Sequence, residues 1–558
     1  MTILRRILCV AVLLATFGVQ SAYAAITPGP LFTDNAVLQQ ELPIPVWGTA
    51  DANEPITVSM NGQTVTTTAD AAGAWSVNLT PMPAGGPYTL TITGTPADTI
   101  TLKNILVGEV WICSGQSNMQ YPLSGFKVAP ELTIYAKVAI PTSADPMLHF
   151  AIVSNTIGIT PRRTVGGAWQ EAKPETVGNL TAVGYFFGRD LRKALGVPVG
   201  LIHVNWGGTS AEAWTSKEAL QAVPELRHLV DEEAAYPDQY PKLLADYNTK
   251  LDAYNTAKAK YQADADAAKA AGTPFTAKAP TPPRRPPTYE HWPNGAAHLF
   301  NGMIAPLIPY GIRGAIWYQG ENNGGRGYEY KTLFPTMIAD WRARWGEGDF
   351  PFYFVQLAPF MGINKAPVAP GANTWADLRE AQRLTLTALP NTGMAVITDL
   401  GASSDVHPRR KEPVGDRLAL IARAQVYGEN VEYSGPVLDS VKITDSKVEI
   451  QFTHAAGLKS IDVHDADDDG PVVATADKLV GFEVAGSDGN YFAADATIDG
   501  NSVVVSSASV SAPVAVRYGW ANYPVANLAN AAGLPASPFK FDNFPWASGP
   551  KDQPTAAK

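Results

Sequence analysis

Cysteine is almost absent from this chain of 558 residues, which contains only Cys9 and Cys113. Residues 1–24 have the pattern of a secretory signal peptide: two arginines, then a short apolar stretch, then the small-x-small sequence Ala22-Tyr23-Ala24. Cleavage after Ala24 would remove Cys9, so the mature chain is expected to have no intrachain disulfide. The alternative, an uncleaved membrane anchor, is less favoured because the apolar stretch is short.

Basic charge and long apolar runs are also scarce. Lysine and arginine number 42 against 52 acidic residues, and loss of the two leader arginines leaves 40 against 52, or a net charge of −12. No basic tract stands out beyond Arg284-Arg285. We therefore expect no nucleic-acid partner. After residue 24 no segment is apolar enough to span a bilayer, so we expect a periplasmic or extracellular protein without membrane contact after cleavage.

Metal and phosphate motifs are missing as well. The eight histidines form no cluster with zinc spacing, and there is no phosphate-binding loop. "DADDDG" at Asp465–Gly470 matches the start of a calcium loop, but its twelfth position is Ala476 instead of glutamate. An acidic turn between strands is the favoured interpretation, and no metal or other cofactor is expected.

The order of patterns along the chain predicts a β–α/β–β organisation. Two alternating runs joined by Asn61-Gly62 predict a hairpin, and turn clusters continue at sandwich-like spacing to about residue 105. Helical periodicity then alternates with apolar strands that end in polar loops, which is typical of a parallel α/β sheet. Strand patterns return from about Tyr433.

The expected domains are therefore a leader (1–24), an N-terminal β-sandwich (25–105), an α/β domain (106–430) and a C-terminal β domain (431–558). The two β segments could also form one domain. An insertion at 216–295 contains an apolar stripe at helical spacing and a proline-rich return, 278–287. Packing of this helix on its own domain is favoured over a coiled-coil partner.

The stretch "VWICSGQSNM" places Ser117 just after a buried strand. A serine at such a turn is exposed, and its backbone N–H faces the same way as its hydroxyl, which suits a nucleophile. A plain helix cap is an equally good interpretation of the serine alone. His407, in "SSDVHP", is the candidate base and Asp405 its carboxylate partner, although an ordinary polar loop would give the same pattern. His203 lies in an apolar strand and is expected to be a core residue.

Candidate oxyanion donors follow two other strands. Gly207 and Gly208 in "NWGGTSAEAW" can bring a backbone N–H close to a ligand. "WYQGENN" supplies three side-chain amides, from Gln319, Asn322 and Asn323. Each of these motifs alone could be an ordinary loop. Several of them at the strand ends of one α/β segment indicate a functional site.

Together these motifs resemble the sialate O-acetylesterase group of SGNH hydrolases. The resemblance rests on "GQSNM", "WGGTSAEAW", "GMIAPLIPYGIRGAIWYQGENN", "LREAQ", "DVHP" and "VRYGWANYPVANLANAAGLPASPF", in this order from about residue 105 to 540. It implies an α/β fold of the SGNH (flavodoxin-like) type, a parallel sheet with helices on both faces, with accessory β-sandwich domains on the N- and C-terminal sides. The group includes bacterial carbohydrate acetylesterases that act on plant polysaccharides.

Carried over by motif, Ser117 resembles the nucleophile, His407 the base and Asp405 the third triad member. Asp405 stands in a D-x-H spacing where D-x-x-H is common, and Asp399 is the reserve carboxylate. Gly208 resembles the second oxyanion donor beside the Ser117 N–H, and Gln319 and Asn323 are candidates for the third.

Three further residues are candidate substrate contacts. Glu321 could orient its loop or touch substrate, Trp520 could line the cleft, and Arg326 could hold a sugar carboxylate.

The expected function is a secreted, metal-independent serine esterase that removes O-acetyl groups from carbohydrate through an acetyl-serine intermediate. Plant cell-wall polysaccharide of xyloglucan or xylan type is the preferred substrate, and 9-O-acetyl sialic acid is the alternative. An esterase for longer acyl chains and a non-catalytic polysaccharide-binding protein are the other hypotheses. The only partner expected is the acetylated carbohydrate, and a monomer is favoured.

Overall fold

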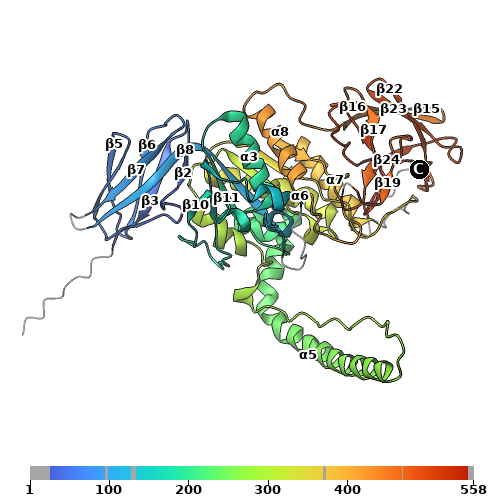
Figure 1. Ribbon diagram of the computed structural model, residues 1–558, viewed down its shortest axis with the longest axis horizontal. Helices are drawn as coiled ribbons and strands as arrows, with labels where there is room; N and C mark the ends of the chain where they lie inside the picture. The colour runs from blue at the N-terminus through green and yellow to red at the C-terminus, as the bar shows by residue number, and fades with distance from the viewer. Residues whose placement is uncertain (1–24, 95–97, 127–133, 368–372, 468, 551–558) are drawn as a thin grey trace, which may run out of the picture.

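The computed structural model describes residues 25–94, 98–126, 134–367, 373–467 and 469–550, so the leader peptide lies outside the described residues. N-terminal strands occupy one end of the molecule, a helix-covered sheet the middle, and C-terminal strands the other end (Figure 1). No helix in the described ranges is long and apolar enough to cross a membrane.

The N-terminal region is built from short strands that pair antiparallel, except β2 (Val37–Gln39), which pairs in parallel with β8 (Thr99–Gly115). The predicted hairpin is present as β4 (Pro55–Met60) and β5 (Gln63–Thr68), with Asn61 and Gly62 both at positive φ as the two-residue turn requires. Its buried residues alternate with exposed ones, so one face packs inward. The other strands before the central sheet are β1 (Thr27–Pro28), β2 (Val37–Gln39), β3 (Ile44–Thr49), β6 (Ala74–Leu79) and β7 (Gly85–Thr93).

One strand, β8 (Thr99–Gly115), belongs to both the N-terminal region and the central sheet. Its first part pairs antiparallel with β7, and its second part pairs in parallel with β11 (Val199–Asn205) and β12 (Gly314–Tyr318). The expected boundary at residue 105 therefore falls inside a continuous strand. The division into an N-terminal, an α/β and a C-terminal domain stays our proposal.

The central sheet has the order β10-β9-β11-β8-β12-β13-β14. All its neighbouring pairs are parallel except that of β10 with β9, which is antiparallel. With the N-terminal strands joined through β8 the sheet is mixed, which corrects the expectation of a purely parallel one. The remaining strands are β9 (Asp145–Ile152), β10 (Trp169–Ala172), β13 (Phe352–Val355) and β14 (Thr392–Ala395).

Helices cover both faces of this sheet. Consecutive residues of a buried strand point to opposite faces, so two neighbouring residues show which helices lie on each face. Ile112 of β8 packs in a core with residues of α6 (Gly327–Trp345) and α7 (Thr374–Ala388), whereas Trp111 packs with α3 (Ala182–Leu195) and α8 (Glu412–Gln425). The predicted end of α3 is confirmed, since Gly196 follows it in the left-handed conformation. Three short helices complete the region: α1 (Ser117–Gln120), α2 (Ile134–Ala139) and α4 (Lys217–Ala222).

The C-terminal strands pair only among themselves in the described residues, so the two β regions are separate. Two four-stranded antiparallel sheets dominate, β15-β16-β23-β22 and β21-β20-β24-β26. The strands are β15 (Val437–Thr444), β16 (Lys447–Thr453), β17 (Lys459–Ser460), β18 (Val463–His464), β19 (Val472–Ala474), β20 (Phe482–Ala485), β21 (Tyr491–Ala493), β22 (Asp495–Asp499), β23 (Ser502–Ser506), β24 (Ala515–Tyr518), β25 (Leu528–Ala529) and β26 (Phe539–Phe541).

The insertion forms a projecting arm. The 44-residue helix α5 (Arg227–Ala270) leaves the body of the molecule, and the chain then runs back in extended form (Figure 1). The expectation that the helix packs along its own domain is wrong beyond its first turns, where its buried residues end at Tyr236. Its partner is the return segment: Tyr261 packs edge-on against Phe275, and Tyr236 donates a hydrogen bond to Pro287 O.

A buried ion pair connects β8 with the strand beside it. The carboxylate of Glu109 is fully buried and accepts two hydrogen bonds from Arg313, at 2.7 and 2.9 Å. Gln40 and Tyr427 donate to the same carboxylate. The Glu109 carboxylate therefore connects the N-terminal region, the central sheet and the chain after α8 through hydrogen bonds.

We predict that Arg313→Met destabilises the protein by about 3–5 kcal/mol, because it leaves the Glu109 carboxylate buried without its counter-charge. Urea unfolding followed by tryptophan fluorescence measures this change. Lys260→Ala, which breaks an exposed pair with Asp264, is the control and should cost less than about 1 kcal/mol. Adding Glu109→Gln to Arg313→Met should restore part of the loss, and equal effects of Arg313→Met and Lys260→Ala would contradict the prediction.

Candidate active site

Ser117 lies at the carboxyl end of β8, as the first residue of α1. β8 is the strand at which the order of the parallel sheet changes direction, with β11 on one side and β12 on the other. Ligands of open α/β sheets bind outside the carboxyl ends of the strands at such a point. The backbone at Gly115 has φ +136°, and a Cβ there would lie 2.2 Å from Tyr318 O, so the turn requires glycine.

The Ser117 hydroxyl and the His407 ring lie within hydrogen-bond reach. The distance from Ser117 Oγ to His407 Nε2 is 2.8 Å, although the two residues are 290 positions apart. Asp405 is placed differently from a completed triad: its Oδ1 accepts the backbone N–H of His407 at 2.9 Å and lies 3.8 Å from Nδ1. Two of the three residues are thus in direct contact, and the carboxylate is near the ring without bonding to it.

The surroundings of His407 favour the neutral imidazole. Burial lowers the pKa of His407 below the usual range, the charge of Lys411 lowers it further, and Asp405 opposes both. Part of the ring is still open to solvent, with 29% of the side chain exposed, and so is 48% of the Asp405 side chain. A neutral, accessible imidazole beside a serine hydroxyl can accept its proton.

Asp399, the reserve carboxylate, does not reach His407. Its two oxygens accept hydrogen bonds from the Arg417 guanidinium at 2.7 and 2.6 Å. This bidentate pair binds the Asp399 carboxylate to α8, the helix that contains Arg417. Asp399 is therefore excluded as the partner of the base. His203 is the buried core residue that we expected, and its Nδ1 accepts the backbone N–H of Thr181.

The backbone N–H groups of Ser117 and Gly208 make no hydrogen bond in the described part of the chain. Gly207 brings the second loop close, because a Cβ on it would lie 3.2 Å from Ser117 Cβ. The Gly207 N–H is itself occupied by Gln120 Oε1 at 2.8 Å. Ser117 and Gly208 are thus the backbone donors open to an oxyanion.

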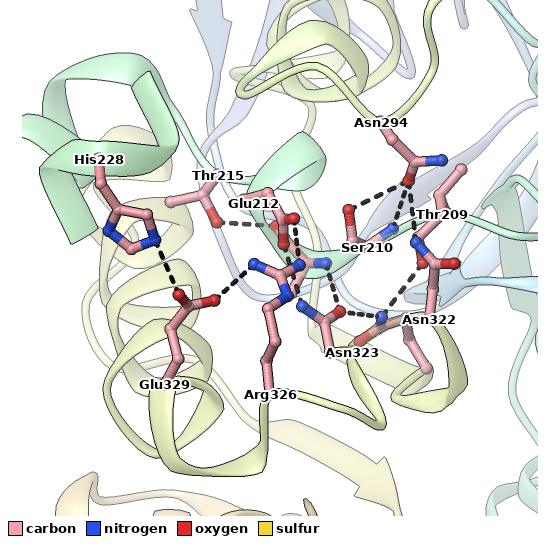
Figure 2. A network of polar contacts seen from close by, with 12 residues as sticks. Thr209, Ser210, Glu212, Thr215, His228, Asn294, Asn322, Asn323, Arg326 and Glu329 are labelled. Atoms are coloured by element: carbon pink, nitrogen blue, oxygen red, sulfur yellow. Dashed lines mark hydrogen bonds and ion pairs between the residues drawn. The ribbon is translucent and has the colours of Figure 1, made fainter. Parts of the chain in front are cut away.

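The side chains of Gln319 and Asn323 are engaged with the protein and fully buried. Gln319 Nε2 donates to Thr209 O and to Asn323 Oδ1, and its Oε1 accepts from Tyr330. Asn323 Nδ2 donates to Glu212, as Figure 2 shows. Both hydrogens of the Gln319 amide are engaged, and the buried Asn323 amide is bonded to Glu212, so we no longer favour either as an oxyanion donor.

The sequence reasoning missed a different amide, that of Gln116. Its Oε1 accepts the backbone N–H groups of Gly320 and Asn322, whereas its Nε2 donates to no group that the structure describes. Asn322, also a sequence candidate, donates instead to Asn294 Oδ1 (Figure 2). The Asn294 amide in turn donates to Gly208 O. The position of Gln116 directly before the nucleophile was the available signal.

Glu321 is partly buried, and its carboxyl group accepts a hydrogen bond from the Asn118 amide at 2.5 Å. Burial raises the pKa of Glu321. Of its two expected roles, loop orientation matches this position better than contact with substrate.

Arg326 is not a free cation. Its guanidinium is paired with Glu212 and with Glu329, and Glu329 also contacts His228 (Figure 2). Two carboxylates already neutralise it, so the expectation that Arg326 holds a substrate carboxylate is not met.

Trp520 lines a pocket of about 240 Å³ together with residues such as Lys365, Lys478 and Phe482, and neither Ser117 nor His407 lines this pocket. An acidic loop of the C-terminal region contacts the segment that leads to the base. Asp465 accepts hydrogen bonds from the backbone and hydroxyl of Ser403, four residues before His407. The "DADDDG" loop therefore contacts the loop that carries His407, and Asp468 within it lies outside the described residues.

No group of three or more histidine, cysteine or acidic side chains arranged to hold a metal ion occurs in the residues that the structure describes.

Comparisons with known proteins identify the family. Residues 288–420 match the family model for carbohydrate esterase, sialic acid-specific acetylesterase. Sialate O-acetylesterase of Rattus norvegicus is 32% identical over 449 residues, covering 74% of this chain and 76% of the relative, and that of Mus musculus is 30% identical over 461 residues, covering 76% and 78%.

A solved structure extends the likeness over nearly the whole chain. A carbohydrate acetylesterase from Xanthomonas citri superposes with a TM-score of 0.73 at 34% identity, covering 93% of this chain and 100% of that one. The match includes both accessory β regions and is consistent with an SGNH-type core. This chain belongs to the sialate O-acetylesterase family and is a carboxylic ester hydrolase of the carbohydrate O-acetylesterase class.

Proposed function

We propose that this protein removes O-acetyl groups from carbohydrate through an acetyl-serine intermediate formed on Ser117. The observation that carries the proposal is the 2.8 Å contact between Ser117 Oγ and His407 Nε2 at the carboxyl end of β8. The relatives named above are sialate O-acetylesterases and a carbohydrate acetylesterase, which supports an acetylated sugar as the substrate.

His407 accepts the Ser117 proton as Oγ attacks the acetyl carbonyl, and the same proton then passes to the departing sugar oxygen. Water next attacks the acetyl-serine, gives a proton to His407 and releases acetate, and Ser117 recovers its hydrogen. Asp405, at 3.8 Å from Nδ1, stabilises the imidazolium by its charge. A small rotation of this half-exposed carboxylate in the substrate complex would complete the hydrogen bond.

The negative charge on the tetrahedral intermediate is held by three donors in this proposal. They are the backbone N–H groups of Ser117 and Gly208 and the unengaged Nε2 of Gln116. Gln116 replaces Gln319 and Asn323 in this role because their amides are bonded within the protein.

Plant cell-wall polysaccharide, of xyloglucan or xylan type, is the substrate that we favour. Arg326 is neutralised by two glutamates, and the carboxylates of Asp405 and Asp465 lie along the loop that carries the base. Acidic groups around the base disfavour a substrate that bears its own carboxylate. The partly open His407 ring also suits a polymer, which cannot enter an enclosed pocket.

Sialic acid is the second candidate because of Arg409, two residues after His407. This guanidinium is half-buried and makes no hydrogen bond or ion pair within the described residues. It could pair with a sugar carboxylate.

Secretion of the enzyme through residues 1–24 is part of the same proposal, and it rests on the sequence pattern alone.

Ser117→Ala is expected to lower kcat by several orders of magnitude, judged from the removal of serine nucleophiles elsewhere. Release of acetate from an acetylated sugar, measured beside the wild type, tests this. A fluorophosphonate probe should label wild-type Ser117 and leave the variant unlabelled. Wild-type turnover by Ser117→Ala would exclude the proposed nucleophile.

Asp405→Asn should move the acidic limb of the kcat/KM profile to lower pH. His407 must be neutral to act as base, so activity falls as the pH drops through its pKa. The Asp405 charge raises that pKa, and its removal therefore lowers it. The same variant should reduce kcat, because the imidazolium loses its counter-charge. A limb that stays in place would show that Asp405 does not act on the base.

Acetate release from acetylated xyloglucan or xylan oligosaccharides, side by side with 9-O-acetyl sialic acid, decides between the two substrates. We expect strong release from the plant oligosaccharides, and Arg409→Ala should leave their KM unchanged because they are neutral. Release from the sialic acid alone, with a KM raised by Arg409→Ala, would establish the second candidate instead.

A further inference from the structure

Asn118, the residue after the proposed nucleophile, is completely buried and uses three of its hydrogen-bonding positions. Its Nδ2 donates to Glu321 Oε1 at 2.5 Å and to the backbone oxygen of Val406 at 2.9 Å. Its Oδ1 accepts from Lys411 Nζ at 2.5 Å. A helix cap, the ordinary use of asparagine in such a turn, does not account for these contacts, because Asn118 lies inside α1 and binds other segments.

These bonds join the two loops that carry the reacting groups. Val406 immediately precedes His407, and Asn118 immediately follows Ser117. The Asn118 side chain therefore links the two segments that carry Ser117 and His407. Lys411 adds a third segment, since it stands directly before α8. The 2.8 Å contact between Ser117 and His407 is thus backed by a second, buried connection between the same loops.

Lys411 is an unusual member of this group because lysine is rarely buried. Only 2% of the residue is exposed, and its ammonium lies 5.1 Å from the ring centres of both Tyr121 and Tyr318. Asn118 is the only hydrogen-bond acceptor for it in the described residues. A strongly hydrated group held in this way costs free energy, which indicates a use for its charge.

We propose that Asn118 and Lys411 form a positioning unit for the catalytic pair: Asn118 fixes the distance between Ser117 and His407, and the ammonium of Lys411 holds His407 in its neutral form. The unit rests on the function proposed above, in which His407 is the base. Neither side chain touches substrate in this proposal.

The charges around His407 support the second part. Lys411 and Asp405 are the two charged groups that act on its pKa, Lys411 to lower it and Asp405 to raise it. Around Lys411 itself the acidic groups are Glu321 and Asp405, and burial lowers its pKa to about 7. His407 titrates below its usual range, where Lys411 is still mostly protonated, so the lysine charge is present when the base must lose its proton.

The test compares Asn118→Ala with a matched buried asparagine, Asn530, in the C-terminal region. Asn530 is 1% exposed and likewise donates two hydrogen bonds, to Ser434 O and His454 O, and accepts one from Leu534 N. Both alanine variants should lower the melting temperature by similar amounts. With 4-nitrophenyl acetate, Asn118→Ala should lower kcat by about 10²-fold with little change in KM, as expected when reacting groups are displaced. Asn530→Ala should retain wild-type kcat.

Lys411→Met provides a readout that loss of structure does not explain. Removing the positive charge should raise the pKa of His407, so the acidic limb of kcat/KM should move to higher pH, opposite to the shift expected for Asp405→Asn. Equal kcat for the two asparagine variants would overturn the positioning role of Asn118. An unshifted limb would overturn the role of Lys411, and if Asn118→Ala does not fold, Lys411→Met decides alone.

A fluorophosphonate probe separates this proposal from the function on which it rests. Failure to label Ser117 in the wild type would reject the proposed nucleophile. Labelling of the wild type at Ser117, with variants that match it in rate and pH profile, would reject the positioning unit only.

Discussion

The structure depends on the continuity of β8. This one strand begins in the antiparallel N-terminal region, passes the buried Glu109–Arg313 pair, and ends at the turn that presents Ser117. Parallel neighbours on both sides hold its carboxyl half, and glycine at position 115 lets the chain turn against Tyr318 O. The position of the nucleophile is therefore set by seventeen consecutive residues of strand and not by a mobile loop. The base, by contrast, comes from a loop, so something else has to fix its position.

The polar residues at this site fall into two groups, those that bond to other protein groups and those with donors that do not. Gln319, Asn323 and Arg326 are polar residues in the right loops, yet each bonds to other protein groups. Such networks fix a loop because an unpaired buried polar group is costly. The groups left with spare donors, on Ser117, Gly208 and Gln116, are those that face no protein partner. In this family member the polar loops thus divide into residues that hold the shape and residues that remain open to a ligand.

Local patterns in the sequence were sufficient to predict the hairpin at Asn61-Gly62, the helix capped by Gly196, and an α/β middle region flanked by β regions. Motif order was sufficient to predict that Ser117 and His407 belong together, although 290 positions separate them. The sequence could not show which amide of a polar run points inward, because that depends on partners such as Glu212 that lie far away in the chain. For the same reason the pairing of Asp399 with Arg417 and the mixed character of the central sheet could not be predicted. The packing partner of α5 was misjudged because its apolar stripe predicts a covered face but not which segment covers it.

The arm formed by α5 and its return segment has a mechanical consequence. Pro237 and Pro241 lie inside the helix close to where it leaves the body, and each lacks the N–H that would bond to the carbonyl four residues earlier. Bending stiffness is therefore lowest at the base, while the remaining helix from Pro241 to Ala270 is about 45 Å long at the usual rise per residue. A lever of this length amplifies small angles, since a change of about 10° at the prolines carries the tip through about 8 Å. The return segment is held at both ends of this lever: Phe275 packs against Tyr261 beyond the prolines, and Pro287 accepts a hydrogen bond from Tyr236 on the body side of them.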